Sequence, residues 1–263
     1  MIEGRLLLVG AGNMGGAMLG RWLASGLEPA QVTVVSPSGR ALPNGVRGVA
    51  AIPAGEAFDI VMLGMKPQQL GQVAPALASL APQLLLSILA GVEIATLAPL
   101  TGAAAVVRAM PNLPVALGAG VTALHGAADD PDARVLAETL ARPLGTVEWI
   151  ADEPLFDAVT ALSGCGPAFL FRFVDALAEA GAALGLPADQ AMRLALATVE
   201  GSARMAMGTA DAPATLADRV ASPGGSTRAG LNVLDEGDAL KRLLADTLRA
   251  SRQRNAELAA AAR

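Results

Sequence analysis

A glycine-rich segment near the start of the chain is the first feature that could carry chemistry. Gly10-Ala11-Gly12-Asn13-Met14-Gly15 follows the apolar run Leu6–Val9 and opens a helical pattern. In this G-x-G-x-x-G spacing Gly10 permits a tight turn, Gly12 lets a pyrophosphate approach the backbone, and Gly15 lets helix and strand pack closely. The free N–H groups of the helix start would bind the anion. We predict a dinucleotide site formed by Gly10, Ala11, Gly12, Asn13 and Met14, with an ordinary glycine-rich turn as the alternative.

The segment after the second apolar run, Val32–Val35, bears on the choice of cofactor. An NAD site usually carries an Asp or Glu about 20 residues beyond the glycine motif, bonded to the ribose hydroxyls. This chain instead reads Ser36-Pro37-Ser38-Gly39-Arg40, and hydroxyls beside an arginine suit a 2′-phosphate. We expect NADP(H) to be preferred over NAD(H). The alternative is a solvated loop whose Arg40 points away.

A second segment of small residues, Ser222-Pro223-Gly224-Gly225-Ser226-Thr227, runs into a helical pattern in the second half of the chain. Its consecutive N–H groups and hydroxyls form a place for a carboxylate, with no positive side chain required. Ser and Thr are also the preferred caps of a helix start, and the spacing alone favours such an ordinary capped helix.

The single cysteine and the single histidine limit the chemistry further. Cys165 cannot form an intrachain disulfide, which fits a reducing compartment. A Cys/His zinc site needs more ligands than Cys165 and His125 can supply. The carboxylates show no metal-ligand spacing either, so we expect no metal. Cys165 has no obvious catalytic partner, and we interpret it as a small residue in a glycine-flanked turn rather than as a nucleophile.

The elements that must position these segments fall into two halves. In the first half, short apolar runs typical of strands buried on both faces alternate with helical patterns. The predicted strands are Leu6–Val9, Val32–Val35, Ile60–Leu63, Leu84–Ile88, Ala104–Arg108 and Val121–Leu124, and the helices include Met14–Ser25, Gln68–Leu80 and Pro131–Arg142. This alternation predicts an α/β fold, with a Rossmann-type NAD(P)-binding domain and a mostly parallel sheet over residues 1–150.

From residue 151 on, the chain reads as Ala- and Leu-rich helices with almost no strand pattern. The predicted helices are Glu153–Ala161, Pro167–Leu184, Ala188–Met207, Thr227–Glu236 and Asp238–Ala261. Their broad apolar faces would be buried well between two copies of the chain. We therefore predict an all-helical dimerisation and substrate domain over residues 151–263, with a monomeric bundle as the alternative.

Composition bears on the class of partner. Of the 263 residues 53% are hydrophobic and 16% charged, and the net charge is −5, so neither nucleic acid nor an anionic membrane is expected as a partner. The most apolar stretch, Leu84–Val92, is too short to span a bilayer, and Leu6–Val9 is too short for a signal peptide. We expect a soluble, cytoplasmic protein that acts on a small molecule.

Several segments taken together resemble the pyrroline-5-carboxylate reductase family over nearly the whole chain. Those shared with the family are Val9–Gly15, Met65-Lys66-Pro67-Gln68, Ser87–Val92, Arg108-Ala109-Met110-Pro111-Asn112, Leu162-Ser163-Gly164-Cys165-Gly166-Pro167-Ala168 and Ala221–Thr227. The first is common to many dehydrogenases, whereas the last two, in this order and spacing, are specific to the family. The chain departs from the family at Cys165, Ser226 and Arg228, where serine, threonine and an apolar residue are usual.

The resemblance implies a Rossmann-type domain followed by a helical domain that interlocks with that of a second copy, and such dimers often assemble into rings. It places the active site between the nucleotide domain of one subunit and helices of the dimer's C-terminal domains. It also implies that Ser36 meets the adenosine end of the cofactor, and that Met65, Lys66, Pro67 and Ala90 lie along it.

The resemblance further implies that the substrate is the cyclic imino acid 1-pyrroline-5-carboxylate, which accepts hydride at its C=N bond to give proline. Thr227, the expected catalytic residue, would reach the ring nitrogen. Glu153 resembles a family carboxylate near the substrate, although it could equally be an acid that complements a helix dipole. The substrate-binding residues implied are Glu153, Ser222, Gly224, Gly225, Ser226 and Thr227.

Two other functions would share part of this pattern, that of a reductase with a different substrate and that of a cofactor-binding sensor. A related reductase acting on another cyclic imine or on a β-hydroxy acid would share the architecture. A β-hydroxy acid enzyme, however, would carry a lysine early in its long helix, and Pro167–Leu184 has none. A non-catalytic NADP-binding sensor would have no need of the second, substrate-shaped segment Ser222–Thr227.

Overall fold

The computed structural model describes residues 2–37, 39, 41–127 and 130–261. The chain divides into two compact units, one of residues 1–165 with 251–263 and one of residues 166–250. These units place residues 151–165 with the sheet, whereas the expected domain boundary follows residue 150. The predicted α/β fold, a Rossmann-type first part followed by helices, is confirmed.

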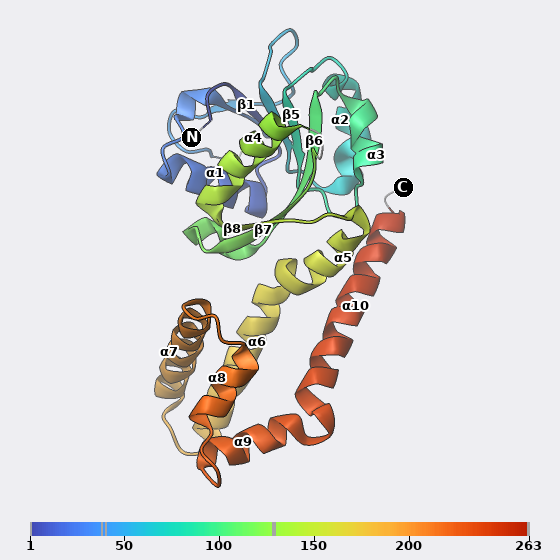
Figure 1. Cartoon of the computed structure of the whole chain (residues 1–263). Helices are drawn as coiled ribbons and strands as arrows, with labels where there is room; N and C mark the ends of the chain where they lie inside the picture. The colour runs from blue at the N-terminus through green and yellow to red at the C-terminus, as the bar shows by residue number, and fades with distance from the viewer. Residues whose placement is uncertain (1, 38, 40, 128–129, 262–263) are drawn as a thin grey trace. The chain divides into compact units, whose positions relative to one another are not determined.

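The first unit is built on one eight-stranded sheet with the strand order β3-β2-β1-β4-β5-β6-β7-β8 (Figure 1). All neighbours pair in parallel except β6 and β7, which are antiparallel, so the predicted mostly parallel sheet is confirmed. The strands are β1 (Leu6–Val9), β2 (Val32–Val35), β3 (Arg47–Val49), β4 (Ile60–Leu63), β5 (Leu84–Ser87), β6 (Ala105–Pro111), β7 (Gly120–Gly126) and β8 (Gly145–Trp149).

Helices cover both faces of this sheet. Helices α1 (Asn13–Ala24) and α4 (Pro131–Ala141) lie on one face, and α2 (Leu70–Leu77) and α3 (Ile94–Leu97) lie on the other (Figure 1). Alternate residues of β1 enter two separate cores, because Leu6 and Leu8 pack with the first helix pair while Leu7 and Val9 pack with the second. Burial on both faces explains why this strand is a continuous apolar run.

Proline-containing 3-10 turns shape many of the connections. Each has a proline in its first two positions, where the missing N–H removes no helical hydrogen bond. They are η1 (Pro29–Gln31), η2 (Pro67–Gln69), η3 (Ala98–Leu100), η4 (Leu113–Leu117), η5 (Arg142–Leu144) and η6 (Glu153–Leu155).

The segment after β8 is helical but irregular. It runs from η6 through α5 (Phe156–Val159) into a π-helical turn, η7 (Thr160–Gly164), and then into α6 (Gly166–Ala183). The π turn is closed by the N–H of Cys165, which donates to the Thr160 carbonyl at 2.9 Å. The predicted single helix Glu153–Ala161 is therefore divided among a 3-10 turn, an α turn and a π turn.

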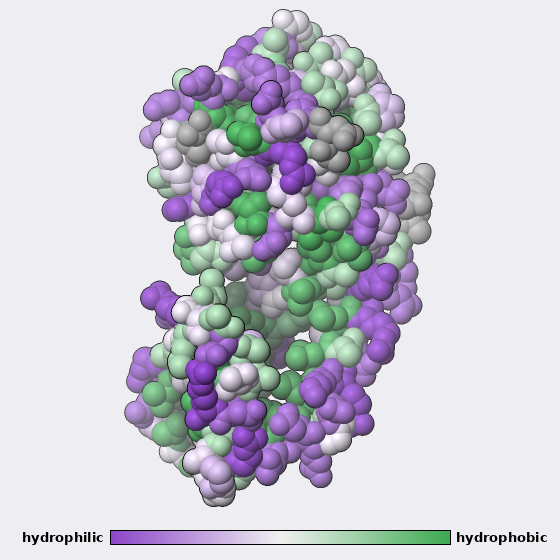
Figure 2. Space-filling model, in the orientation of Figure 1, coloured by the Kyte–Doolittle hydropathy of each residue, from purple (hydrophilic) through white to green (hydrophobic). Residues whose placement is uncertain are grey.

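The second unit is helical. It contains α6, α7 (Ala188–Met207), α8 (Pro213–Val220), α9 (Ser226–Asp235), η8 (Glu236–Asp238) and the first part of α10 (Ala239–Ala261). A small core between α6 and α7 is formed by Val174, Ala178 and Ala195. Large apolar side chains remain outside it, and Figure 2 shows part of this hydrophobic surface; Leu170, Phe171, Phe173, Leu177, Leu194, Leu196, Leu243 and Leu244 are each at least 41% exposed. A surface of this kind marks an interaction face.

One helical run, Glu153–Ala183, is long and apolar enough to cross a membrane by length and composition alone. The stretch Leu84–Val92, the most apolar by the sequence pattern, forms the buried strand β5 and the loop after it. Only 11% of the most apolar window of Glu153–Ala183 is buried. The apolar surface of this run needs a cover, which either a second copy or lipid could supply.

The Glu56 carboxylate gives the first unit a testable dependence on pH. It pairs with Arg47 at 2.8 Å and with Arg5 at 2.5 Å. Hydrogen bonds from Arg47 and then from Arg5 lower the pKa of Glu56 to about 2. Because this folded pKa lies below the unfolded one, the stabilisation is present above the ordinary glutamate range and is lost as pH falls toward 2.

We expect Glu56→Gln to flatten the loss of stability between about pH 5 and about pH 2, because it removes the group that must be protonated. Urea unfolding followed by circular dichroism across that range measures this. Glu148→Gln is the control, since Glu148 is exposed and has no ion partner in the described part of the chain. An equally steep acid dependence in Glu56→Gln and the parent would contradict the prediction.

Candidate active site

A cavity of about 580 Å³ lies at the carboxyl ends of three neighbouring strands. It is lined by Val9-Gly10 at the end of β1, by Val35-Ser36-Pro37 at the end of β2, and by Gly64-Met65-Lys66 after β4. The chain proceeds from β1 toward β2 and β3 on one side and returns to β4 and β5 on the other. This is the point where the strand order reverses, and open α/β sheets bind ligands there.

The three motif glycines have three different geometric roles. Gly10 has φ +89°, and a Cβ on it would lie 2.8 Å from the Met65 nitrogen, so the turn requires glycine. A Cβ on Gly15 would lie 2.9 Å from the Gly10 carbonyl oxygen, which is the predicted close packing of helix on strand. A Cβ on Gly12 would meet nothing within 4 Å, so this glycine leaves open space beside the pocket.

The start of α1 is free to bind an anion. Its cap is Gly12, with no side-chain hydrogen bond to the cap and no acidic residue in the first turn. The first-turn N–H groups of a helix lack partners within the helix and carry its positive dipole end. The pocket therefore fits a dinucleotide, whose pyrophosphate would lie against Gly12 and the start of α1.

Most of the residues expected at the cofactor come together in this pocket. It is lined by Gly10, Ala11, Gly12, Asn13, Met14, Ser36, Met65 and Lys66. Pro67 and Ala90 are not among its lining residues. Pro67 begins η2 directly after Lys66, and Ala90 lies in the turn after β5. Ser38 and Arg40, on which the expected NADP(H) preference also rests, lie outside the described residues.

One wall of the pocket is formed by residues that are not among the expected site residues. Gln69, Gln72 and Val73 line it from η2 and α2, and the Gln69 side-chain oxygen accepts a hydrogen bond from the Lys66 N–H at 3.1 Å. Residues three and four apart share a face of a helix. The spacing of these three within the predicted helix Gln68–Leu80 was therefore a signal that could have found them.

The segment Ser222–Thr227 forms a tight turn and then a helix start. The Gly225 N–H donates to the Ser222 carbonyl at 3.0 Å, with Pro223 and Gly224 between them and Gly224 at φ +70°. Pro followed by a glycine of positive φ is the signature of a type II turn. The turn leads directly into α9, whose first residue is Ser226.

The start of α9 is not capped by a side chain. Its cap residue is Gly225, and Ser226 and Thr227 occupy the first two helical positions, so neither serves as the expected N-cap. The Thr227 side chain is exposed, and its hydroxyl has no hydrogen-bond partner among the residues that the structure describes. N–H groups and a hydroxyl are thus left available together, which is the arrangement that a carboxylate with a neighbouring polar atom requires.

Arg228, one of the departures from the family, is held by the preceding helix. Its Nη2 lies 2.7 Å from Asp218 Oδ1, so the ion pair bridges α8 and α9 on either side of the turn. The charge of Arg228 is therefore paired within the second unit.

Glu153 lies in a contact that the sequence did not predict. Its Oε1 accepts hydrogen bonds from Arg108 Nη1 at 2.9 Å and from the backbone N–H of Ile94 at 2.8 Å. Arg108 is not among the expected site residues, and only the structure reveals its contact with Glu153. Whether Glu153 contacts substrate stays a prediction.

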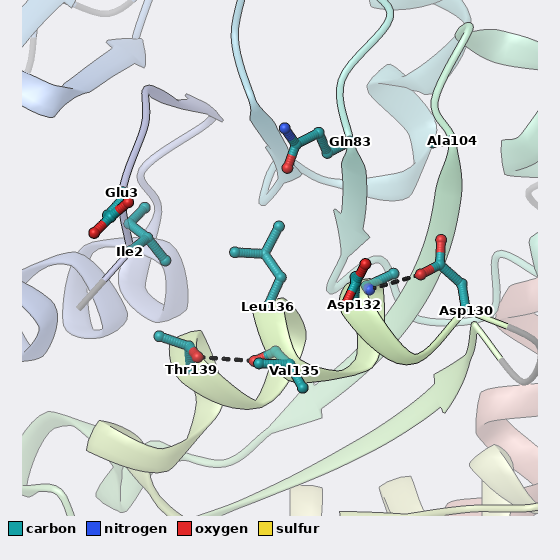
Figure 3. Close-up of a pocket in the computed structure, with 10 residues that line it drawn as sticks. Ile2, Glu3, Gln83, Ala104, Asp130, Asp132, Val135, Leu136 and Thr139 are labelled. Carbon is teal, nitrogen blue, oxygen red and sulfur yellow. Dashed lines mark hydrogen bonds between the residues drawn. The ribbon is translucent and has the colours of Figure 1, made fainter.

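A second cavity of about 580 Å³ lies at the amino ends of the strands, and Figure 3 shows the residues that line it. It is lined by residues that precede strands, such as Glu3, Gln83 and Ala104, and by the first turns of α4. None of the expected site residues is among those that line it. Asp130 accepts from the Ala133 N–H at 2.9 Å, and the Thr139 hydroxyl donates to the Val135 carbonyl, so these polar groups serve α4 itself.

Neither Cys165 nor His125 forms a catalytic pair. The Cys165 sulfur lies 3.4 Å from the Ser251 hydroxyl. His125 lies in β7, and its Nδ1 lies 2.8 Å from the Ile150 carbonyl oxygen. Among the described residues no group of three or more His, Cys, Asp or Glu side chains could hold a metal ion, and the expected absence of a metal stays a prediction.

Fold and pocket together define a Rossmann-type dinucleotide-binding protein with an attached helical unit. Curated relatives match almost the whole chain. The pyrroline-5-carboxylate reductase of Pseudomonas aeruginosa is 38% identical, with 97% of each chain covered. That of Pisum sativum is 36% identical, with 95% of this chain and 94% of the relative covered. The chain belongs to the pyrroline-5-carboxylate reductase family. It is an oxidoreductase with a nicotinamide cofactor.

Solved structures and family models agree with this membership. A pyrroline-5-carboxylate reductase from Coxiella burnetii is similar with a TM-score of 0.85, 32% identity and coverage of 97% and 98%. A pyrroline carboxylate reductase from Plasmodium falciparum with NADP bound gives a TM-score of 0.84, 27% identity and coverage of 98% and 99%. The family models for pyrroline-5-carboxylate reductase dimerisation and for NADP oxidoreductase, coenzyme F420-dependent, match residues 153–258 and 5–91.

Glycine-to-alanine substitutions separate the role of the pocket from that of the fold. Gly12→Ala should melt near the parent temperature yet weaken NADPH binding by roughly tenfold or more, because its methyl group occupies space needed by the pyrophosphate. Gly10→Ala should instead lower the melting temperature, because φ is positive and Met65 is too close.

Gly20→Ala is the matched control, since it lies in α1 with open space around it. Thermal melting and fluorescence titration with NADPH measure the two effects. Parent-like NADPH affinity in folded Gly12→Ala would show that the pyrophosphate does not lie there.

Proposed function

We propose that this chain reduces 1-pyrroline-5-carboxylate to L-proline with a nicotinamide cofactor. The observation that carries the proposal is the uncapped start of α9 beside the free Thr227 hydroxyl, in a chain that also has a dinucleotide pocket. The substrate has one carboxylate and one imine nitrogen close together, and this pair of groups matches the two kinds of donor. Membership of the family supports the same reaction.

In the proposed mechanism the turn and the helix start hold the substrate. The N–H groups of the first turn of α9 bind the carboxylate, with the Ser222–Gly225 turn setting their direction. The Thr227 hydroxyl hydrogen-bonds the ring nitrogen and orients it. An alcohol is too weak an acid to protonate the imine efficiently at neutral pH, so Thr227 acts by orientation or through water.

When bound, the cofactor would supply the hydride that the carbon of the C=N bond accepts, while the ring nitrogen takes a proton from water. The role of the protein is then to fix the distance and direction between two bound reactants, which is a large source of rate acceleration. Gly12 and the start of α1 hold the pyrophosphate, and residues after β4 lie along the cofactor.

We further propose that NADP(H) is preferred over NAD(H). No acidic residue follows β2 in the described part of the pocket wall, where Ser36 and Pro37 lie. The Plasmodium falciparum relative was solved with NADP bound. Ser36→Asp should shift the ratio of activities toward NADH.

The exposed apolar surface of the second unit supports a homodimer with interlocked helices, and a larger ring of such dimers is the further expectation. The family model for dimerisation matches residues 153–258, which include the whole second unit. Burial against a second copy, rather than lipid, is our proposal for the run Glu153–Ala183, and a cytoplasmic location follows from it and from the single cysteine.

Absorbance of NADPH during turnover is the first test of the reaction. We expect rapid oxidation that depends on added 1-pyrroline-5-carboxylate, slower oxidation with NADH, and a smaller difference between the two cofactors in Ser36→Asp. No oxidation with either cofactor, in protein shown to be folded, would overturn the proposed reaction. An unchanged NADPH/NADH ratio in Ser36→Asp would overturn only the cofactor preference.

Thr227→Ala tests the orienting hydroxyl. Turnover should fall by about 10- to 100-fold, because the ring nitrogen loses its hydrogen-bond partner, while NADPH affinity stays close to the parent value. Thr227→Ser, which keeps a hydroxyl, is the matched control and should retain most of the turnover. Equal turnover in Thr227→Ala and the parent would remove Thr227 from the mechanism.

A further inference from the structure

A buried arginine of β6 and a partly exposed carboxylate of the segment after β8 form an ion pair. Arg108 of β6 is 5% exposed, and its Nη1 donates to Glu153 Oε1 at 2.9 Å. The guanidinium also lies over the ring of Phe156, at 4.6 Å from the ring centre, and Phe156 is 2% exposed. Packing against Phe156 thus holds the Arg108 side chain in place, and the Arg108 guanidinium in turn holds the Glu153 carboxylate.

The same carboxylate oxygen holds a second element. Glu153 Oε1 accepts the backbone N–H of Ile94 at 2.8 Å, and Ile94 is the first residue of α3. The cap residue of α3, Glu93, makes no side-chain cap hydrogen bond, so Glu153 supplies from a distance the acceptor that this helix start needs. One oxygen therefore joins β6, α3 and the segment after β8.

The loop that α3 anchors follows β5, the strand next to β4 and its pocket-lining residues. A dinucleotide bound at the switch point puts its pyrophosphate at the end of β1. Its adenosine half would then extend toward Ser36 after β2. The nicotinamide half would extend the other way, past Met65 and Lys66 after β4 and toward the neighbouring strand β5. The loop between β5 and α3, residues 88–93, begins at the end of β5 and ends at Ile94.

We propose that Arg108 and Glu153 are positioning residues for hydride transfer. Arg108 holds the Glu153 carboxylate, the carboxylate holds the start of α3, and α3 in turn fixes loop 88–93 against the nicotinamide half of the cofactor. This inference rests on the proposed function. It assigns Glu153 an indirect role, in place of the substrate contact that the family resemblance implied.

The two roles of Glu153 predict different kinetics. A carboxylate that contacts the imino acid affects mainly the KM for that substrate, and it does so whether or not Arg108 is present. A carboxylate that acts through α3 affects mainly kcat, because a small misplacement of the reacting atoms is costly while each ligand still binds. It also requires Arg108, so the two substitutions should not be additive.

The first experiment is a double-mutant cycle on the intact enzyme with Arg108→Met, Glu153→Gln and both together. We expect each single variant to lower kcat by roughly tenfold or more, with KM for 1-pyrroline-5-carboxylate and the Kd of NADPH changing by less than about threefold. The double variant should be about as slow as either single one. Glu56→Gln is the matched control, because it removes another paired carboxylate of the same unit away from the pocket, and it should keep the parent kcat.

A second variant removes the hydrogen bond without changing either charged residue, which guards against failure of Arg108→Met to fold. Ile94→Pro deletes the donor N–H together with the isoleucine side chain. The position accepts proline, because it is the first of α3 and Glu93 before it is extended at φ −81°, ψ 158°. Ile94→Ala is its control, losing the same side chain but keeping the N–H.

We expect Ile94→Pro to lower kcat well below that of Ile94→Ala, again with little change in either KM. Equal kcat in Ile94→Pro and Ile94→Ala would overturn the proposal. Two results together would overturn the proposal in favour of substrate contact. The KM for the imino acid would rise in Glu153→Gln but not in Arg108→Met, and the losses of the two single variants would multiply in the double variant. Since all comparisons are made relative to a parent enzyme that turns over, failure of the proposed reaction itself is detected separately.

Discussion

Burial of the central parallel strands on both faces is the constraint from which the rest of the first unit follows. β1 and β4 are fully buried, so helices must cover both sides of the sheet, and each connection must return across one face to start the next parallel strand. The carboxyl ends of β2, β1 and β4 therefore lie together at the same end of the sheet. The cofactor pocket lies there because the chain diverges in opposite directions from β1.

The two proposed ligand sites use the same physical device on different units. Helices α1 and α9 both begin after a glycine, Gly12 and Gly225, with no side-chain cap hydrogen bond. Helix α4 shows the contrast, because the Asp130 side chain caps its first turn. An uncapped helix start leaves N–H groups for an anion, so the pyrophosphate and the substrate carboxylate can both be held without a buried positive side chain.

The strands that the sequence predicted best are those buried on both faces. β1 and β4 are continuous apolar runs, and β2 is interrupted only by the buried Thr33, so all three have their predicted bounds. β3 and β8 were missed, since they lie at the two edges of the sheet and are largely or alternately exposed. The short helices α3 and α8 were missed as well, because too few residues define a helical period.

The sequence by itself determined the features that depend on neighbours in the chain: the glycine turn at Gly10–Gly15, the type II turn before α9 and the alternation of strands and helices. Local backbone preference decides these, and the residues that express it are adjacent. Only the tertiary structure decided that Arg108, Glu153 and Ile94 meet. Such contacts join residues far apart in sequence, so they are set by how the sheet and its helices pack rather than by any local pattern.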